Sequence, residues 1–298
     1  MARIAVVGVG AVGGAVAAPL CASGAHEVVL CVREPFATLA VDAPKERIEV
    51  PARCEREPGR VGAVDWVLLA TKAYDTAGAA PWLEALCRAG TVLAVLQNGV
   101  EHAERVQPFA GRAEILPVVV ECPVERTAPG RVTQRASARL TVPAGPRGDA
   151  FAALFAGTSI GAETSADFAS AAWRKLCLNV ASGPLLALTG RPHEVLHSPG
   201  MAALARGLIA ECVAVGRAEG ARLEDGLADA LVGRLLAAPP KAGTSMLYDR
   251  RAGRRLEGDA RNGAVVRFGA RHGIATPLNQ AVCALLEASV DSRAGGER

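Results

Sequence analysis

Residues 4–14 read IAVVGVGAVGG, an apolar run that breaks into the pattern Gly8-x-Gly10-x-x-Gly13. In this spacing the first glycine permits a tight strand-to-helix turn, the second lets the backbone approach a pyrophosphate, and the third allows close packing of helix on strand. A helix that begins here presents free N–H groups and the positive end of its dipole to phosphates. The pattern alone is weak evidence in a chain with 32 glycines, so its surroundings decide its meaning.

The flanking sequence supplies a βαβ context. Residues 4–7 are strand-like, residues 11–21 form an alanine-rich helical run, and residues 27–32 supply a second strand. A strand-turn-helix without a ligand is the alternative interpretation. We expect a dinucleotide-binding loop made of Gly8, Val9, Gly10, Ala11, Val12 and Gly13.

The residue that reads the cofactor's ribose lies about 20 positions beyond the glycines, at the end of the second strand. Arg33 stands there. A guanidinium pairs with a 2′-phosphate, whereas a carboxylate would accept hydrogen bonds from a free 2′-hydroxyl. Arg33 therefore predicts NADP (NADPH) rather than NAD. Glu34 keeps NAD open, since a shift of one residue would place a carboxylate there, and an ordinary surface arginine is the remaining alternative.

Composition narrows the class of protein. The chain has 298 residues, enough for two domains, and 50% hydrophobic with 21% charged residues fits a soluble globular enzyme. We expect no membrane-spanning run and no secretory signal, and hence a cytoplasmic location without membrane partners. The net charge of +3 and the dispersed basic residues do not suggest nucleic acid. Eight scattered cysteines without a C-x-x-C pair predict reduced thiols and no metal site.

Lysine is rare in this chain. Of 33 basic residues only Lys45, Lys72, Lys175 and Lys241 are lysine, so arginine serves where a cation merely solvates a surface. A lysine kept inside a motif is there for what arginine cannot do, which is to release a proton or act as a compact point charge. Lys72 and Lys175 are candidates on this ground.

The first half of the chain alternates strands and helices, with strands expected at residues 66–70 and 91–96 around a helix at 81–87. This rhythm predicts an α/β fold with a doubly wound parallel sheet. Short β-rich pieces at 115–120, 131–134 and 139–142 are expected as antiparallel strands that finish the sheet edge.

From residue 167 the pattern becomes helical, with helices expected at 168–182, 201–219, 227–238, 260–272 and 278–289 and a frayed tail at 293–298. We therefore predict an N-terminal Rossmann-type domain, residues 1–165, that binds NADP, followed by an all-helical substrate and catalytic domain, residues 166–298.

Two polar residues follow strands of the predicted sheet. Lys72 and Asn98 stand at the carboxyl ends, where ligands bind in such sheets. For Asn98 a simple Asn-Gly turn is the alternative.

In the helical half, Lys175 and Asn179 are four residues apart and share a helix face among Ala, Leu and Cys. A lysine there is costly to bury unless it has a task or a partner, although it could snorkel at the domain edge. Glu257 and Asp259 precede an apolar-faced helix, and for Asp259 we favour a first-turn acid that complements the helix dipole.

Jointly, the motifs of this chain resemble those of the ketopantoate reductases (2-dehydropantoate 2-reductases), although any one of them alone would be weak evidence. The matching residues are G-x-G-x-x-G-G at the N-terminus, Arg33, T-K-A at 71–73, Q-N-G at 97–99, Pro129-Gly130, W-R-K-L-x-x-N at 173–179, S-M-L-x-D at 245–249, E-x-D at 257–259 and N-G at 262–263. The resemblance implies a Rossmann domain joined to a helical domain with the active site between them. It further implies transfer of a hydride from NADPH to the C2 carbonyl of a small 2-oxo acid. Apart from the resemblance, a homodimer is the candidate assembly.

The resemblance also implies residue roles. Lys175 would donate the proton and stabilise the developing alkoxide, Ser245 would hold the substrate, and Asn98 and Asn179 would bind substrate or cofactor. Glu257 would lie at the junction of substrate and nicotinamide ribose and orient Lys175, and Lys72 would contact the cofactor.

Two positions depart from the family pattern. Well-known members carry a second asparagine four residues after the one matching Asn179, where this chain has Gly183, and often an asparagine where it has His193. Loss of a hydrogen bond to a substrate hydroxyl weakens recognition of that hydroxyl specifically. Ketopantoate is the leading substrate. A reductase of another small or branched 2-oxo acid is the first alternative, and a non-catalytic NADP-binding protein is the second.

Overall fold

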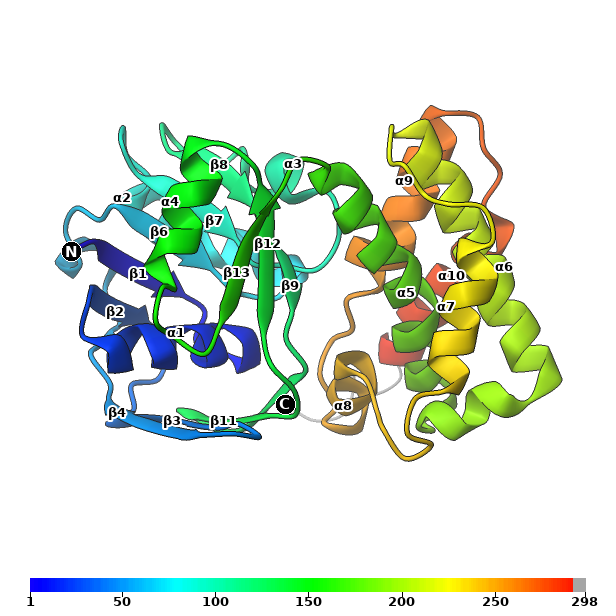
Figure 1. Ribbon diagram of the computed structural model, residues 1–298, viewed down its shortest axis with the longest axis horizontal. Helices are drawn as coiled ribbons and strands as arrows, with labels where there is room; N and C mark the ends of the chain where they lie inside the picture. The colour runs from blue at the N-terminus through cyan, green and yellow to red at the C-terminus, as the bar shows by residue number, and fades with distance from the viewer. Residues whose placement is uncertain (292–298) are drawn as a thin grey trace. The chain divides into compact units, whose positions relative to one another are not determined.

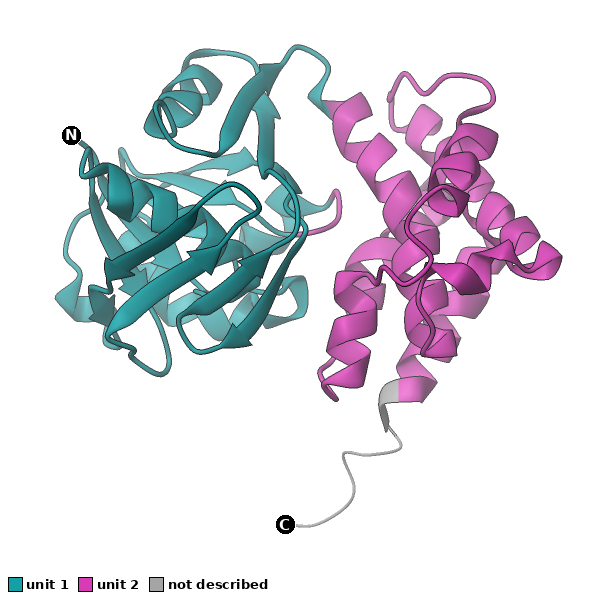
Figure 2. Ribbon diagram, turned by 60° about the horizontal axis from the view of Figure 1, so that its bottom comes forward, with its two compact units in different colours: residues 1–97, 101–168 teal, residues 98–100, 169–298 magenta. Residues whose placement is uncertain are grey.

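The computed structural model describes residues 1–291, so the tail expected at 293–298 lies outside the described range. The chain forms two compact units (Figure 2). The first comprises residues 1–97 and 101–168, and the second comprises residues 98–100 and 169–298. The chain thus leaves the first unit for three residues directly after Gln97.

A parallel six-stranded sheet forms the centre of the first unit (Figure 1). Its order is β5-β2-β1-β6-β7-β8, and every neighbouring pair is parallel. The strands are β1 (Arg3–Val7), β2 (Glu27–Cys31), β5 (Cys54–Glu55), β6 (Trp66–Leu69), β7 (Val92–Val95) and β8 (Glu114–Pro117). Consecutive residues of β1 enter apolar clusters on opposite faces, Val6 on one and Val7 on the other. A sheet covered on both faces is what a doubly wound α/β fold requires, and the predicted fold class is confirmed.

Helix α1 (Ala11–Ser23) lies between this sheet and a second sheet of four strands, β10-β11-β3-β4. These strands are β3 (Thr38–Asp42), β4 (Arg47–Pro51), β10 (Val124–Ala128) and β11 (Arg131–Gln134). A Cβ on Gly14 would lie 2.8 Å from Val132, so the glycine lets β11 approach the helix. Because α1 is covered on two sides, its sequence is apolar all round.

The expectation that the β-rich pieces finish the edge of the main sheet holds only for residues 115–117, in the edge strand β8, which is parallel to β7 rather than antiparallel. The predicted strand at 115–120 is two strands separated at Val118, β8 in the main sheet and β9 (Val119–Glu121) in a third sheet. That sheet has the order β13-β12-β9, with β12 (Arg139–Pro143) parallel to β13 (Gly161–Ser165) and antiparallel to β9. Side-chain alternation indicates that a segment is extended but not which strand it joins.

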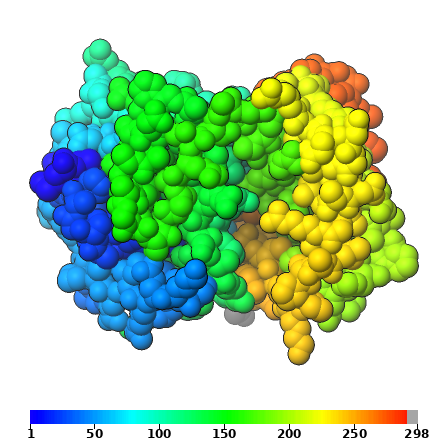
Figure 3. All heavy atoms as spheres, viewed as in Figure 1, coloured from blue at the N-terminus to red at the C-terminus, as the bar shows by residue number. Residues whose placement is uncertain are grey.

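Short helices complete the first unit: η1 (Pro58–Arg60), η2 (Ala73–Asp75), η3 (Ala77–Ala79), α2 (Ala80–Leu86), α3 (His102–Val106) and α4 (Pro146–Leu154). Helix α4 packs on β12 and β13, where a Cβ on Gly148 would meet the carbonyl of Pro143 at 2.0 Å. In Figure 3 the green atoms of α4, β12 and β13 cover the middle of the visible face of this unit, and blue atoms of the N-terminal segments lie beside and below them.

The second unit is helical in its described part, as predicted (Figure 1). Its elements are α5 (Phe168–Thr189), η4 (His193–His197), α6 (Pro199–Ala218), α7 (Leu227–Leu236), α8 (Ser245–Arg251), the π-helical turn η5 (Asp259–Gly263), α9 (Ala264–Arg271) and α10 (Pro277–Asp291). They enclose one apolar core, in which Trp173 meets Phe268 edge to face with ring centroids 5.6 Å apart. The predicted helix at 260–272 consists of the π-helical turn η5 followed by the α-helix α9. Helix α8 was not predicted from the sequence.

Helix α5 continues past its expected end at Ser182, through Pro184, to Thr189. A proline has no N–H, so Pro184 leaves the carbonyl of Val180, four residues earlier, without its helical donor. The Nδ2 of Asn262 donates to that carbonyl at 2.9 Å and to Oδ1 of Asn279 at 2.9 Å. An amide from a neighbouring element thus replaces the missing backbone donor, which explains why the proline does not end the helix.

The expectation that no apolar run of this chain reaches membrane-spanning length is wrong for helix α6. Its 20 residues are long and apolar enough to cross a membrane by length and composition alone. Its inward face, with Leu208, Ile209 and Cys212, belongs to the apolar core of the second unit. A helix in the core of a globular unit can be equally long and apolar, so length and composition alone do not distinguish the two cases.

Candidate active site

The glycine loop lies between β1 and α1 in the first unit. Gly8 has φ +91°, and a Cβ there would meet Thr71 Cγ2 at 2.6 Å and Thr71 N at 2.7 Å. A Cβ on Gly13 would meet the Gly8 carbonyl oxygen at 2.2 Å. Packing within the protein therefore requires glycine at both positions.

Gly10 differs from these two glycines. A Cβ at Gly10 would meet nothing within 4 Å, so no protein contact requires the missing side chain. Gly10 precedes α1, whose start has no side-chain cap and no acidic residue in its first turn. Open space beside an uncapped helix N-terminus fits a pyrophosphate. Around it, Val9 is buried and Ala11 and Val12 are half-buried.

Arg33 lies two residues beyond the end of β2. Its side chain is 78% exposed, and its Nη2 forms an ion pair with Oδ2 of Asp75 at 2.5 Å. Glu34 beside it is exposed. The guanidinium is accessible, but a phosphate that binds it would compete with the Asp75 carboxylate.

Lys72 is half-buried after β6, and the buried side chain of Gln97 links this segment to the end of β7. The Nε2 of Gln97 donates to Oγ1 of Thr71 and of Thr76, both at 3.0 Å. Gln97 thereby holds the turn against which Gly8 packs. Sequence reasoning gave Gln97 no role of its own, although its place between a buried strand and Asn98 was a usable signal.

Residues of the second unit form a hydrogen-bonded cluster that contains Lys175. The Nζ of Lys175 donates to Oδ1 of Asn98 at 3.2 Å, and Nδ2 of Asn98 donates to Oε2 of Glu257 at 3.0 Å. The Nη2 of Arg261 donates to the same Oε2 at 3.3 Å and to Oγ of Ser245 at 3.2 Å. Four predicted site residues, far apart in sequence, therefore belong to one connected group.

The segment 98–100 reaches this cluster because Gly99 allows it. Gly99 has φ +107°, and a Cβ there would lie 2.6 Å from the carbonyl oxygen of Ala260. Neither the dihedral angle nor the close approach tolerates a side chain. The Asn-Gly pair is therefore more than a surface turn, since it brings Asn98 against the π-helical turn η5.

Three positions share one face of α5: Lys175, Asn179 and Gly183, each four residues after the last. Asn179 is half-buried, and its side chain makes no hydrogen bond to another residue in the described part of the chain. Its amide can accept and donate hydrogen bonds to a ligand. Gly183 is buried at the far end of this face.

Arg261 is the residue that sequence reasoning missed. Its side chain is 3% exposed, against 1% for its partner Glu257, so it is an exception to the view that arginines of this chain solvate the surface. The expected solvated group at 250, 251, 254 and 255 is indeed exposed. A signal was available, because Arg261 is four residues after Glu257, so that in a helix the two side chains share one face.

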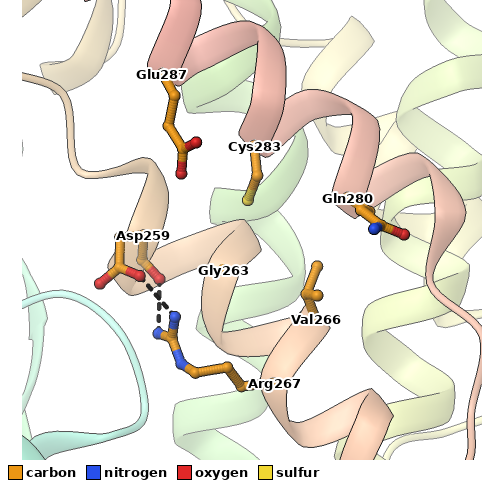
Figure 4. A pocket seen from close by; sticks show the side chains of 7 residues that line it. All are labelled: Asp259, Gly263, Val266, Arg267, Gln280, Cys283 and Glu287. Atoms are coloured by element: carbon orange, nitrogen blue, oxygen red, sulfur yellow. Dashed lines mark hydrogen bonds and ion pairs between the residues drawn. The ribbon is translucent and has the colours of Figure 1, made fainter.

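Two other predicted positions lie outside this hydrogen-bonded cluster. The Nδ1 of buried His193 bonds the carbonyl of Ala242 at 2.8 Å, which fixes the loop before α8. Asp259 pairs with Nη1 of Arg267 at 2.6 Å beside a pocket lined also by Gly263, Val266, Gln280, Cys283 and Glu287 (Figure 4). None of the predicted catalytic or ligand-binding residues lines that pocket.

The chain is similar to known proteins over nearly its whole length. The family model for ketopantoate reductase PanE/ApbA matches residues 4–147, and the model for the C-terminal part of ketopantoate reductase PanE/ApbA matches residues 167–290. The 2-dehydropantoate 2-reductase of Caulobacter vibrioides is 49% identical over 97% of this chain and 99% of its own length. That of Mycobacterium tuberculosis is 43% identical over 97% of this chain and 98% of its own length.

Solved structures give the same result. The crystal structure of a PanE/ApbA family ketopantoate reductase from Ralstonia eutropha superimposes with a TM-score of 0.88 at 33% identity, covering 97% of this chain and 98% of that one. Both family models and relatives of nearly the full length therefore match, and the chain belongs to the ketopantoate reductase family of oxidoreductases.

Proposed function

We propose that this chain catalyses the NADPH-dependent reduction of 2-dehydropantoate (ketopantoate) to pantoate. The observation that carries the proposal is the hydrogen-bonded cluster in which Lys175, Asn98 and Glu257 are joined. It is supported by the 49% identity to a 2-dehydropantoate 2-reductase over almost the whole chain.

Lys175 would carry out the proton chemistry. An ammonium at the keto oxygen stabilises the negative charge that develops there and then gives its proton to the alkoxide. Asn98 holds the Nζ of Lys175 through its Oδ1, and Glu257 in turn fixes the Asn98 amide. Ser245 and Asn179 would orient the substrate. Bound NADPH would supply the hydride.

The first unit provides the residues that would hold NADPH. These are the loop residues Gly8, Val9, Gly10, Ala11, Val12 and Gly13, with Arg33 for the 2′-phosphate and Lys72 beside them. Asn98 and Glu257 of the second unit would contact its nicotinamide ribose. The open space at Gly10 and the exposed guanidinium of Arg33 support this assignment.

A second candidate function is reduction of another small or branched 2-oxo acid. Gly183 favours it, because residue 183 has no side chain of its own that could form a hydrogen bond with the hydroxyl of ketopantoate. The reaction and the role of Lys175 would be the same, and only the groups that select the substrate would differ.

The test is the rate of NADPH oxidation by the purified protein with ketopantoate, pyruvate or 2-oxoisovalerate, and with NADH in place of NADPH. Rapid turnover of ketopantoate with NADPH alone is the expected result. Turnover of another 2-oxo acid in preference would establish the second function, and absence of turnover with every acid would refute both.

We also predict a homodimer and a cytoplasmic location, which light scattering and cell fractionation would check.

A further inference from the structure

Gly183 leaves room for a specific side chain. A Cβ at this position would lie 2.6 Å from Nη1 of Arg261 and 2.8 Å from Sδ of Met246. Contacts below 3.0 Å are not tolerated, so any side chain at 183 would displace the guanidinium. The guanidinium of Arg261 therefore occupies the space that a side chain at position 183 would fill.

The guanidinium still has donor capacity. Both of its hydrogen bonds, to Ser245 and Glu257, come from Nη2. Its Nε is buried and has no hydrogen-bond partner among residues 1–291. A buried donor without a partner is rare and costly in a folded protein, unless a ligand supplies the acceptor. Ser245, whose Oγ accepts from Nη2, is an exposed residue, so the hydrogen-bonded group that contains the guanidinium extends to the surface.

Arg261 and Lys175 mark the two ends of the cluster. Lys175 and Gly183 are eight residues apart on one face of α5, which is about 12 Å along a helix. Glu257 connects these ends, since its Oε2 accepts from Asn98 on the Lys175 side and from Arg261 on the Gly183 side. Asn98 and Glu257 thus connect the ammonium of Lys175 to the guanidinium of Arg261 by hydrogen bonds between side chains.

We propose that Arg261, in the space left by Gly183, is a specificity-determining residue that donates a hydrogen bond to the hydroxyl of the substrate at the end remote from its keto group. This inference rests on the proposed 2-oxo acid reduction and deepens it. It explains how a site without a side chain at 183 can still select a hydroxylated substrate.

Two substrates isolate this contact. Ketopantoate and trimethylpyruvate (3,3-dimethyl-2-oxobutanoate) share the carboxylate, the keto group and the quaternary carbon, and differ only in the terminal hydroxyl. A site that hydrogen-bonds a hydroxyl rejects the analogue without it, because its own polar group is then left unpaired. We expect the native enzyme to prefer ketopantoate by roughly 100-fold or more in kcat/KM.

The first variant is Arg261→Lys, which keeps the cation beside Glu257 and removes the guanidinium fork. We expect kcat/KM for ketopantoate to fall about tenfold further than kcat/KM for trimethylpyruvate, the range of one hydrogen bond to a charged donor, because only ketopantoate loses that bond. Arg206→Lys, at an exposed arginine of α6, is the matched control. Equal losses with both substrates, or no loss with either, would overturn the proposal.

The second arm displaces the guanidinium instead of shortening it. Gly183→Ala should lower the ketopantoate preference in the native background and have little further effect in the Arg261→Lys background, because both changes act on the same donor. Gly233→Ala in α7 is the control, since a Cβ there meets nothing within 4 Å. Additive effects on the preference would refute a shared role. If the native enzyme reduces neither acid, the proposed function itself fails, and that result is distinct from loss of the preference.

Discussion

Lys175 is held in place by an amide rather than exposed on a helix surface. Its Nζ donates to Oδ1 of Asn98, whose own amide group is fixed by Glu257. A positioned ammonium can both stabilise negative charge and give up a proton, and arginine can do only the first because it keeps its proton throughout the accessible pH range. Exchange of Lys175 for arginine would therefore separate the two parts of its proposed role, stabilisation of negative charge and donation of a proton.

Replacement of Lys175 by methionine should lower kcat by about 100-fold or more, the usual contribution of a positioned general acid. NADPH affinity should change little, because the glycine loop and Arg33 belong to the first unit. Lys175→Arg should be nearly as slow, because the cation remains but its proton is not released. Lys241→Met, at an exposed lysine, is the control. Near-native turnover by Lys175→Arg would exclude proton donation by this residue.

Arg33 should determine the choice between the two nicotinamide cofactors. Arg33→Ala removes the partner of the 2′-phosphate, so KM for NADPH should rise about tenfold or more while KM for NADH stays nearly constant. The measurement is initial rates at varied cofactor concentration, with Arg60→Ala, another exposed arginine of the same unit, as the control. Equal effects on both cofactors would contradict the assignment.

At the scale of elements, α5 carries a proline in its interior and continues for five more residues. The donor that Pro184 lacks is supplied by Asn262, which is fully buried and also bonds Asn279. Asn279 in turn donates to Oε2 of Glu211 at 2.7 Å. A polar chain thus runs from α5 through η5 and α10 to α6 inside an apolar core, where unpaired groups would be costly.

Asn262→Ala should reduce the free energy of unfolding by about 1–3 kcal/mol, since it leaves the Val180 carbonyl without a donor. In a Pro184→Ala background the restored N–H can donate to that carbonyl, so the same substitution should cost less there. Urea unfolding of the four proteins in this double-mutant cycle measures the difference. Equal costs in both backgrounds would show that Asn262 does not compensate for the proline.

At the scale of the whole molecule, the eight cysteines are free and distributed over both units. Burial raises the pKa of Cys21, Cys87 and Cys283 to about 11 and that of Cys31 to about 12. A raised pKa keeps a thiol protonated near neutral pH, and the thiolate is the reactive form.

The native protein should therefore react slowly with a disulfide reagent such as DTNB near neutral pH, whereas all eight thiols should react at once in denaturant. The rate in the native state should rise with pH as the thiolate fraction grows. Rapid reaction of several thiols in the native state would mean that they are far more accessible than the structure indicates.

Patterns in the sequence were enough to predict the glycine loop, the βαβ order and the helical second half, and to mark Lys175 as a candidate. These depend on residues that are close in sequence: glycines that a local turn requires, apolar periodicity along one element, and a lysine kept where arginine is the rule. The predicted cofactor and catalytic roles rest on the same local motifs together with family resemblance.

Three features became visible only in the folded chain: which strands pair, the separation at Val118 of two strands of different sheets, and the support that Asn262 gives to α5 beyond Pro184. It also decided that Gly183 and Arg261, 78 positions apart (261 minus 183), occupy one space. Neither residue by itself indicates the other, because their contact arises from the packing of separate helices. Local patterns specify elements, but packing between distant segments determines which side chains meet.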